Sequence, residues 1–345
     1  MTETGSMTKY GTQVLVTGGG GFLGGALARR LAAEGAVVRS YSRGTYPELA
    51  AAGIEVVRGD LADAAATARA VAGCDVVYHV AALAGLWGRY DTYHAANVTG
   101  TENILRACRE NGVSRLVYTS SPSVVYGRDS LDGVDETTPY PQRFEAHYPR
   151  TKAVAEQLVL AANDAQLATV ALRPHLIWGP GDQHLVPRIL ARARAGQLRI
   201  VGDGKNLVDS IYIDNAVDAH VAAAERLATT AAPAGRAYFL SQGEPLAMAD
   251  LLNRILAAGG VAPLQRRVPY RLAVAAGATL EIVHRVLGRE SEPRMTRFLA
   301  RQLGTAHWFD IGAARRDLGY EPRVSIDDGM RRLAAWLRGK REAAV

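Results

Sequence analysis

The sequence predicts an α/β fold in which a doubly wound parallel sheet is followed by a smaller, mostly helical C-terminal part. In the first half of the 345 residues, short apolar runs alternate with helical patterns. A glycine-rich turn follows the first apolar run directly. After residue 174 the alternation gives way to turn signals, two further strand-like runs and then helical patterns.

The expected strands are short and rich in valine and leucine, and helical patterns lie between most of them. The first, residues 13–17, leads into a helix over 22–33 with Leu23, Leu27 and Leu31 on one face. Five more runs of strand type follow, at 36–41, 54–57, 75–80, 115–119 and 168–172. Further strand-like runs lie at 211–213 and 237–240, with a helix expected over 215–227. Because parallel strands need crossover connections, this order predicts a parallel sheet with helices on both faces.

The last hundred residues are mostly helical in pattern. One apolar stripe at helical spacing comprises Leu272, Ala276, Leu280, Val283 and Leu287. Such a stripe favours a helix that faces the core, and it is also compatible with one wall of an apolar pocket.

Composition excludes several classes of protein. Hydrophobic residues make up 48% and charged residues 21%, which is ordinary for a folded chain. The net charge of +6 is spread along the sequence without a cluster, so no nucleic-acid surface is expected. Two cysteines, Cys74 and Cys108, provide neither a disulfide framework nor zinc spacing, and no metal site is expected. Without a leader-like or membrane-spanning apolar run, the interpretation is a cytoplasmic protein.

The glycine-rich turn has the spacing Gly18-x-x-Gly21-x-x-Gly24 between a strand and a helix. Glycines let the backbone approach a pyrophosphate closely, and the helix N-terminus attracts its charge. This context predicts a dinucleotide cradle. Its expected contacts are Gly18, Gly21, Phe22, Leu23 and Gly24.

The end of the second strand bears on the choice of cofactor. An Asp or Glu there would bind the ribose 2′-hydroxyl of NAD. Here Ser42 stands in that place and Arg43 follows it. A hydroxyl and a guanidinium can bind a 2′-phosphate, so the sequence favours NADP(H) over NAD(H). The alternative is that Arg43 is a solvated loop residue.

Tyr148 and Lys152 lie four residues apart at the start of a helical pattern, which places them on one helix face. An adjacent ammonium favours a phenolate and is therefore expected to lower the pKa of the tyrosine. The phenol can then exchange a proton with a substrate oxygen, and these two residues are predicted to be catalytic.

Together these motifs resemble the extended short-chain dehydrogenases/reductases, over nearly the whole chain. The resemblance implies a Rossmann-type sheet in residues 12–174, to which residues 207–240 return. Residues 175–206 and 241–335 would form the substrate-binding part, and 1–11 and 336–345 would be flexible tails. It also implies that Ser121, or Ser120 if the register slips, is the third catalytic group and that Lys152 binds the nicotinamide ribose. Further implied cofactor contacts are Asp60, Leu61, Ala81 and Pro174.

Within this superfamily the chain resembles the 3β-hydroxysteroid dehydrogenase-like branch. Val208 stands where sugar-nucleotide enzymes usually carry a diphosphate-binding arginine. The segment 173–182 is similar to bacterial 2-alkyl-3-oxoalkanoate reductases of long-chain olefin biosynthesis. That likeness implies NADPH-dependent reduction of a long-chain 3-keto acid. The substrate carboxylate would need a partner, for which His184, Arg188 and Lys205 are candidates, and His175 could contact the substrate.

Two other functions stay open. A sterol or 3β-hydroxysteroid also combines a secondary alcohol with a large apolar surface. A non-catalytic dinucleotide sensor or scaffold is disfavoured because such proteins usually lose the Tyr/Lys pair, which this chain keeps. The expected partners are a long hydrophobic substrate, a second copy of the chain and other olefin-pathway enzymes, with no membrane span.

Overall fold

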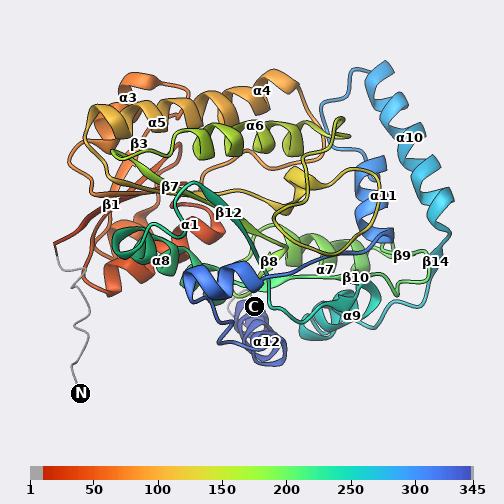
Figure 1. The fold of residues 1–345 in the computed structure, drawn as a ribbon. Coiled ribbons are helices and arrows are strands. Elements are labelled where there is room, and N and C mark those ends of the chain that lie inside the picture. The colour runs from red at the N-terminus through yellow and green to blue at the C-terminus, as the bar shows by residue number, and fades with distance from the viewer. Residues whose placement is uncertain (1–10, 343–345) are drawn as a thin grey trace.

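The computed structural model describes residues 11–342 (Figure 1). Its centre is a seven-stranded sheet in the order β12-β7-β5-β4-β1-β2-β3, with every neighbouring pair parallel. The strands are β1 (Gln13–Thr17), β2 (Val37–Ser42), β3 (Glu55–Arg58), β4 (Val76–His79), β5 (Arg115–Thr119), β7 (Ala168–Pro174) and β12 (Arg236–Leu240). The predicted parallel sheet is confirmed.

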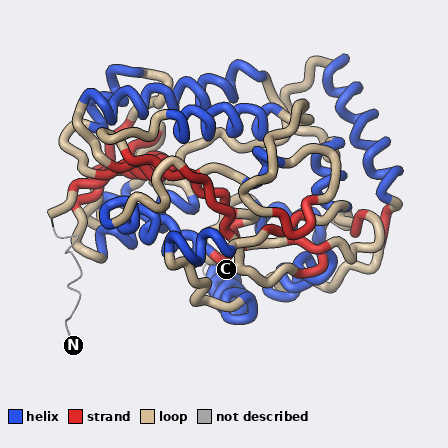
Figure 2. Tube along the Cα trace, viewed as in Figure 1, coloured by secondary structure: helices blue, strands red, loops and turns tan. Residues whose placement is uncertain are grey.

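Helices cover both faces of this sheet, as Figures 1 and 2 show. One face carries α1 (Phe22–Ala33) and α8 (Ile213–Thr229). The other carries α3 (Ala64–Val71), α5 (Gly100–Glu110) and α6 (His147–Ala161). Since both faces are covered, Leu15, Val77 and Leu116 in the central strands are fully buried, as expected for parallel strands.

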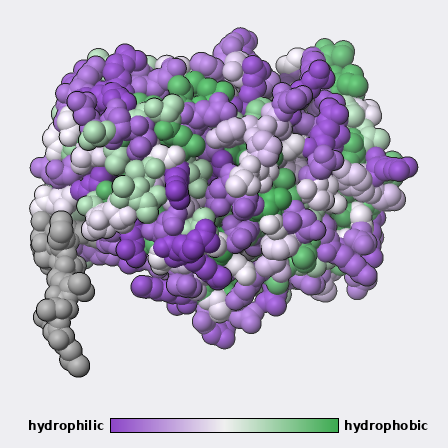
Figure 3. All heavy atoms as spheres, viewed as in Figure 1, coloured by the Kyte–Doolittle hydropathy of each residue, from purple (hydrophilic) through white to green (hydrophobic). Residues whose placement is uncertain are grey.

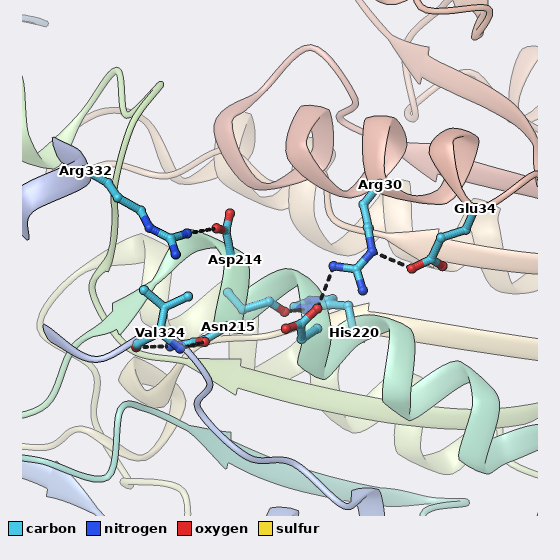
Figure 4. Close-up of polar contacts among 9 residues, drawn as sticks. Arg30, Glu34, Asp214, Asn215, His220, Val324 and Arg332 are labelled. Atoms are coloured by element: carbon cyan, nitrogen blue, oxygen red, sulfur yellow. Dashed lines mark hydrogen bonds and ion pairs between the residues drawn. The ribbon is translucent and has the colours of Figure 1, made fainter. Parts of the chain in front are cut away.

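Polar contacts join the helices on the α1 side of the sheet (Figure 4). Arg30 of α1 donates to Glu34 one turn later and, at 2.7 Å, to Asp218 of α8. Asn215 at the start of α8 donates to the carbonyl of Val324 at 2.8 Å. The Arg30–Asp218 bond thus joins α1 to α8, and the Asn215–Val324 bond joins the C-terminal chain to α8.

The shorter strands form three small sheets. A four-stranded sheet has the order β13-β10-β15-β6, formed from β13 (Leu246–Ala247), β10 (Leu207–Val208), β15 (His307–Phe309) and β6 (Leu131–Val134). Two-stranded pairs join β8 (Ile177–Trp178) to β11 (Ile211–Tyr212) and β9 (Ile200–Val201) to β14 (Arg267–Val268). The remaining α-helices are α2 (Pro47–Ala50), α4 (Tyr90–His94), α7 (Leu185–Arg194), α9 (Met248–Ala258), α10 (Tyr270–Val286), α11 (Arg297–Gly304) and α12 (Ile326–Glu342).

Helix α10 forms where the apolar stripe predicted it, but the expected orientation is wrong. Leu272, Val283 and Leu287 of the stripe are exposed instead of facing the core. The helix packs on α11 through its smallest residues. A Cβ at Gly277 would lie 2.6 Å from the backbone of Thr296, so the close approach requires glycine and turns the larger apolar side chains outward.

The C-terminal helix extends further than the sequence suggested. Helix α12 includes residues 336–342, which were expected to belong to a flexible tail. Trp336 and Leu337 pack against the main core, and the Lys340 ammonium lies 4.3 Å from the centre of the Trp336 ring. Residues 1–10 and 343–345 of the expected tails lie outside the described residues. Within residues 11–342, no helix is long and apolar enough to cross a membrane.

Candidate active site

A cleft of about 740 Å³ opens at the carboxyl ends of the central strands, where ligands bind in doubly wound sheets. All the residues that the sequence predicted for catalysis and cofactor binding line this one cleft. They are Gly18, Gly21, Phe22, Leu23, Gly24, Ser42, Arg43, Asp60, Leu61, Ala81, Ser121, Tyr148, Lys152 and Pro174. The fold therefore brings together segments that lie up to 156 residues apart, from Gly18 to Pro174.

The glycine loop has the geometry of a close backbone turn. Gly18 has a φ of +71°, which favours glycine, and a Cβ at Gly24 would lie 2.3 Å from the carbonyl oxygen of Gly18. Helix α1 begins directly afterwards and has no acidic residue in its first turn. The N-terminal amides of α1 are therefore available to an anion such as a pyrophosphate.

Tyr46 is a cleft residue that the sequence analysis missed. Its ring lies over the glycine loop, because a Cβ built on Gly20 would be 1.9 Å from the ring. No local pattern in the sequence marks this contact, since it depends on how the loop after β2 folds back.

The end of β2 leaves one polar atom without a partner. The Ser42 hydroxyl is buried and has no hydrogen-bond partner within residues 11–342. The neighbouring Arg43 is exposed, and Arg58 donates from Nε to the Arg43 carbonyl at 3.0 Å. The cleft is thus lined here by Ser42, with its spare hydroxyl, and by Arg43.

Helix α6 places Tyr148 and Lys152 in the cleft, one turn apart. Lys152 is buried, donates to the carbonyl of Thr119 at 2.6 Å, and lies 4.1 Å from the centre of the Tyr118 ring. Burial lowers the pKa of Lys152 to about 7, while the nearby Glu156 carboxylate opposes that change. The ammonium of Lys152 is therefore only partly retained at neutral pH.

The protein's own groups do not lower the pKa of Tyr148 below its ordinary value, so the expected lowering is wrong. Burial raises the pKa of Tyr148 above its ordinary value, and the neighbouring Ser121 hydroxyl lowers it in part. The stabilisation expected from Lys152 is weakened because burial also discourages the charge on that lysine. Tyr148 is thus held protonated, as a proton donor must be.

The two candidate serines occupy different settings. Ser121 lies close enough to Tyr148 to lower the pKa of its phenol, and its Oγ lies 2.9 Å from Oγ of Ser123. The Ser120 hydroxyl is buried and has no partner within the described chain. Both serines line the cleft, but the contact with Tyr148 favours Ser121 as the third group.

Behind the lysine lies a buried ion pair that the sequence analysis did not identify. Glu156, one turn after Lys152, accepts bonds from Arg173 Nε at 2.9 Å and Nη2 at 2.6 Å. Tyr140 donates its hydroxyl to the same carboxylate at 2.7 Å. The bidentate geometry fixes α6 against β7 and keeps a negative charge close to Lys152.

A π-helical turn, Ala95–Thr99, supports the opposite wall. The Asn97 side chain accepts from the Leu83 amide at 2.7 Å and donates to the Leu83 carbonyl and to Thr151 Oγ1. It thereby joins the cleft loop to α6. His79, the last residue of β4, bonds Thr17 and Thr101 inside the core, where burial lowers its pKa to about 3.

The structure separates the residues considered for substrate binding. His184 lines the cleft, whereas the Arg188 guanidinium is paired with Glu292. Lys205 lies between β9 and β10, away from the residues that line the cleft. His175 is buried, bonds the carbonyl of Asp209 at 2.7 Å and does not line the cleft.

The comparisons with known proteins agree with this geometry. The chain is 55% identical over 325 residues to a 2-alkyl-3-oxoalkanoate reductase of Stenotrophomonas maltophilia, covering 94% of this chain and 98% of the relative. It is 50% identical over 334 residues to a 2-alkyl-3-oxoalkanoate reductase of Shewanella oneidensis, covering 94% and 86%. A crystal structure of UDP-glucuronic acid 4-epimerase from Bacillus cereus in complex with NAD shares the fold, with a TM-score of 0.73 at 22% identity, covering 95% and 99%.

The model of the 3-beta hydroxysteroid dehydrogenase/isomerase family matches residues 15–270, a range that contains every predicted cleft residue. Both relatives are named as reductases, and the chain matches each of them along most of its length. The chain therefore belongs to the 3-beta hydroxysteroid dehydrogenase/isomerase family of oxidoreductases.

Proposed function

We propose that this protein reduces the 3-keto group of a long-chain 2-alkyl-3-oxoalkanoate to the corresponding 3-hydroxy acid, with NADPH as the reductant. The observation that carries the proposal is the meeting of Tyr148, Ser121 and Lys152 in the cleft that holds the glycine loop. The names of the relatives that are 50–55% identical support this substrate class.

The residues of the cleft fit a nicotinamide dinucleotide. The glycine loop and the start of α1 would hold the pyrophosphate, and Asp60 and Leu61 would lie against the adenosine end. Lys152 and Pro174 would lie at the nicotinamide end. When bound, the reduced nicotinamide supplies the hydride that adds to the carbonyl carbon.

The side chains then complete the reduction at the carbonyl oxygen. Ser121 donates a hydrogen bond to this oxygen and so stabilises the charge that develops on it. Tyr148 donates its phenolic proton to the same oxygen, which gives the alcohol. Lys152, held by the carbonyl of Thr119 at 2.6 Å, would bind the ribose hydroxyls of the cofactor and place its amino group near Tyr148. One hydride and one proton thus balance the conversion of ketone to alcohol.

For the substrate carboxylate we propose His184. Among His184, Arg188 and Lys205 it is the one that lines the cleft. Arg188, one turn later in α7, is already neutralised by Glu292. An imidazole that donates a hydrogen bond suits a carboxylate, and the apolar neighbours Leu176, Ile177 and Leu185 suit alkyl chains.

The function can be tested in the oxidation direction with stable substrates. A synthetic long-chain 2-alkyl-3-hydroxyalkanoic acid and a 3β-hydroxysteroid would each be mixed with NADP+ and followed by nicotinamide absorbance. We expect turnover of the hydroxy acid at a kcat/KM at least about tenfold above that of the steroid. The steroid is the second candidate because the family to which the chain belongs is named after 3-beta hydroxysteroid dehydrogenases. Turnover of the steroid alone would refute the proposal.

Cofactor preference gives a separate prediction. Arg43→Gln should weaken NADPH binding by about tenfold to a hundredfold, because a charge-assisted bond to the 2′-phosphate contributes about 1.5–3 kcal/mol. NADH binding should stay unchanged, because that cofactor has a hydroxyl in place of the phosphate. Titration of protein fluorescence with each cofactor measures both constants. Arg338→Gln, an exposed arginine of α12, is the matched control. Equal effects of Arg43→Gln on both cofactors would contradict the assignment.

A further inference from the structure

Helix α10 has its polar and apolar faces reversed relative to an ordinary surface helix. The face packed on the protein consists of Ala273, Gly277, Glu281 and His284. Glu281 accepts from the backbone and side chain of Arg297, and His284 shares a hydrogen bond with the carbonyl of Ser291 at 3.0 Å. The two polar residues of the packed face, Glu281 and His284, are thus satisfied inside the protein.

The outward face of α10 is apolar. Five large hydrophobic side chains at helical spacing are exposed: Leu272 by 59%, Ile282 by 58%, Val283 by 39%, Val286 by 80% and Leu287 by 57%. Within residues 11–342 only Val37 and Leu207 are comparable, and both stand alone. Figure 3 shows apolar atoms at the edge of the molecule where the C-terminal end of α10 lies in Figure 1. A contiguous exposed apolar face of this kind marks a contact surface, because leaving it in water is unfavourable.

Exposed arginines surround this apolar face. They precede the helix, lie on it and follow it: Arg266, Arg267, Arg271, Arg285, Arg289 and Arg294. None of the six guanidinium groups forms an ion pair within residues 11–342. Two acidic residues nearby are already paired, because Glu281 binds Arg297 and Glu292 binds Arg188. Glu290 is then one carboxylate against six arginines. The surroundings of the apolar face are therefore positively charged.

The C-terminal end of α10 is connected to the mouth of the cleft on two sides. Trp87, in the loop that continues from cleft residues Leu83 and Ala84, donates from its indole to the carbonyl of Arg289 at 3.1 Å. Its ring also packs edge-on against His284, with centroids 6.0 Å apart. The Arg188–Glu292 pair joins the segment after α10 to α7, whose first residue, Leu185, lines the cleft.

We propose that α10 docks in the surface of an anionic lipid bilayer, with its apolar face in the acyl boundary and its arginines at the headgroups. Apolar residues on one side and arginines around them are the pattern of interfacial helices. Charge distinguishes this occupant from a second copy of the chain. A symmetric dimer through α10 would bring two sets of unpaired arginines together, whereas anionic headgroups would neutralise them.

Docking in this orientation would place the mouth of the cleft next to the bilayer. If the substrate is a long-chain 2-alkyl-3-oxo acid, which rests on the proposed function, its alkyl chains could enter from the lipid without crossing water. Membrane docking itself rests on α10 alone and does not depend on the identity of the substrate.

The test is flotation of the full-length protein with vesicles, at low ionic strength, without substrate. Vesicles of phosphatidylcholine mixed with phosphatidylglycerol should bind the protein at least about tenfold more strongly than phosphatidylcholine alone, and added salt should release it. The double variant Ile282→Gln, Val286→Gln should lose at least about tenfold of the binding. Val37→Gln is the matched control, because it removes an exposed apolar side chain from β2, on the main sheet.

Two further measurements make the outcome unambiguous. Circular dichroism and turnover of a short, water-soluble ketone should be unchanged in the double variant, because Ile282 and Val286 lie outside the cleft. Absence of flotation with the anionic vesicles would overturn the proposal, and so would equal flotation of the double variant. If the double variant turned an oligomer into a monomer and left flotation unchanged, the outward face of α10 would instead be assigned to contact with a second copy of the chain. Loss of long-chain activity with intact vesicle binding would count against the proposed substrate and not against docking.

Discussion

Tyr148→Phe is expected to lower kcat by about a hundredfold to ten-thousandfold, the range attributed to a positioned general acid. The variant keeps the partly buried ring and removes only its hydroxyl. Cofactor binding and the unfolding midpoint should therefore change little. Initial rates with a saturating ketone measure the effect.

Tyr126→Phe is the matched control for that experiment. Tyr126 is a buried tyrosine whose hydroxyl bonds a side-chain oxygen, Thr305 Oγ1 at 2.9 Å, but it does not line the cleft. Its removal should leave kcat within about twofold and lower the free energy of unfolding by about 1 kcal/mol. Retention of more than a tenth of the activity in Tyr148→Phe would show that another group delivers the proton.

Lys152→Met is expected to abolish most activity and to change the pH dependence of stability. The pKa of Lys152 is lowered by burial to about 7 in the folded chain, against about 10.4 in an unfolded one. Below pH 7 the folded protein must keep a buried ammonium, which costs about 4–5 kcal/mol. This cost decreases as the pH rises from 7 and is absent above about pH 10, where the lysine is neutral in both states.

The substitution removes that cost and also the hydrogen bond to the Thr119 carbonyl, whose loss costs about 1–3 kcal/mol. The variant should therefore be more stable than the parent by about 2 kcal/mol at pH 6 and less stable by about 1 kcal/mol near pH 10. Urea unfolding at both pH values measures the difference, with Lys340→Met of α12 as an exposed control. A difference that does not vary with pH would mean that the lysine keeps an ordinary pKa.

Much of the fold and the cleft could be predicted because the information is local. The glycine spacing 18–21–24 follows a strand directly, and Tyr148 and Lys152 share a helix face by spacing alone. The pKa of Tyr148 could not be predicted, because it depends on how completely the phenol and its cationic neighbour are buried together. The contact of Tyr46 with Gly20 likewise depends on a loop that folds back across the glycines.

The outward turn of α10 shows why hydrophobic periodicity can mislead. A stripe of leucine and valine predicts a buried face only if that face is the one that meets the protein. Here the small residues Ala273 and Gly277 allow the closer approach to α11, and the buried Glu281 is satisfied by Arg297. The sequence contains both faces, but only the tertiary contacts decide which of them is covered.

The parallel pairing of β6 with β15 has a consequence for protein engineering. It joins Leu131, from the segment between β5 and α6, to His307, which lies 176 positions later. A chimera that exchanges only the chain after residue 240 with that of a homologue would leave one strand of this pair from each parent. Grafting of substrate preference between homologues should therefore transfer residues 131–134 together with the later segment, so that both partners of the pair come from the same protein.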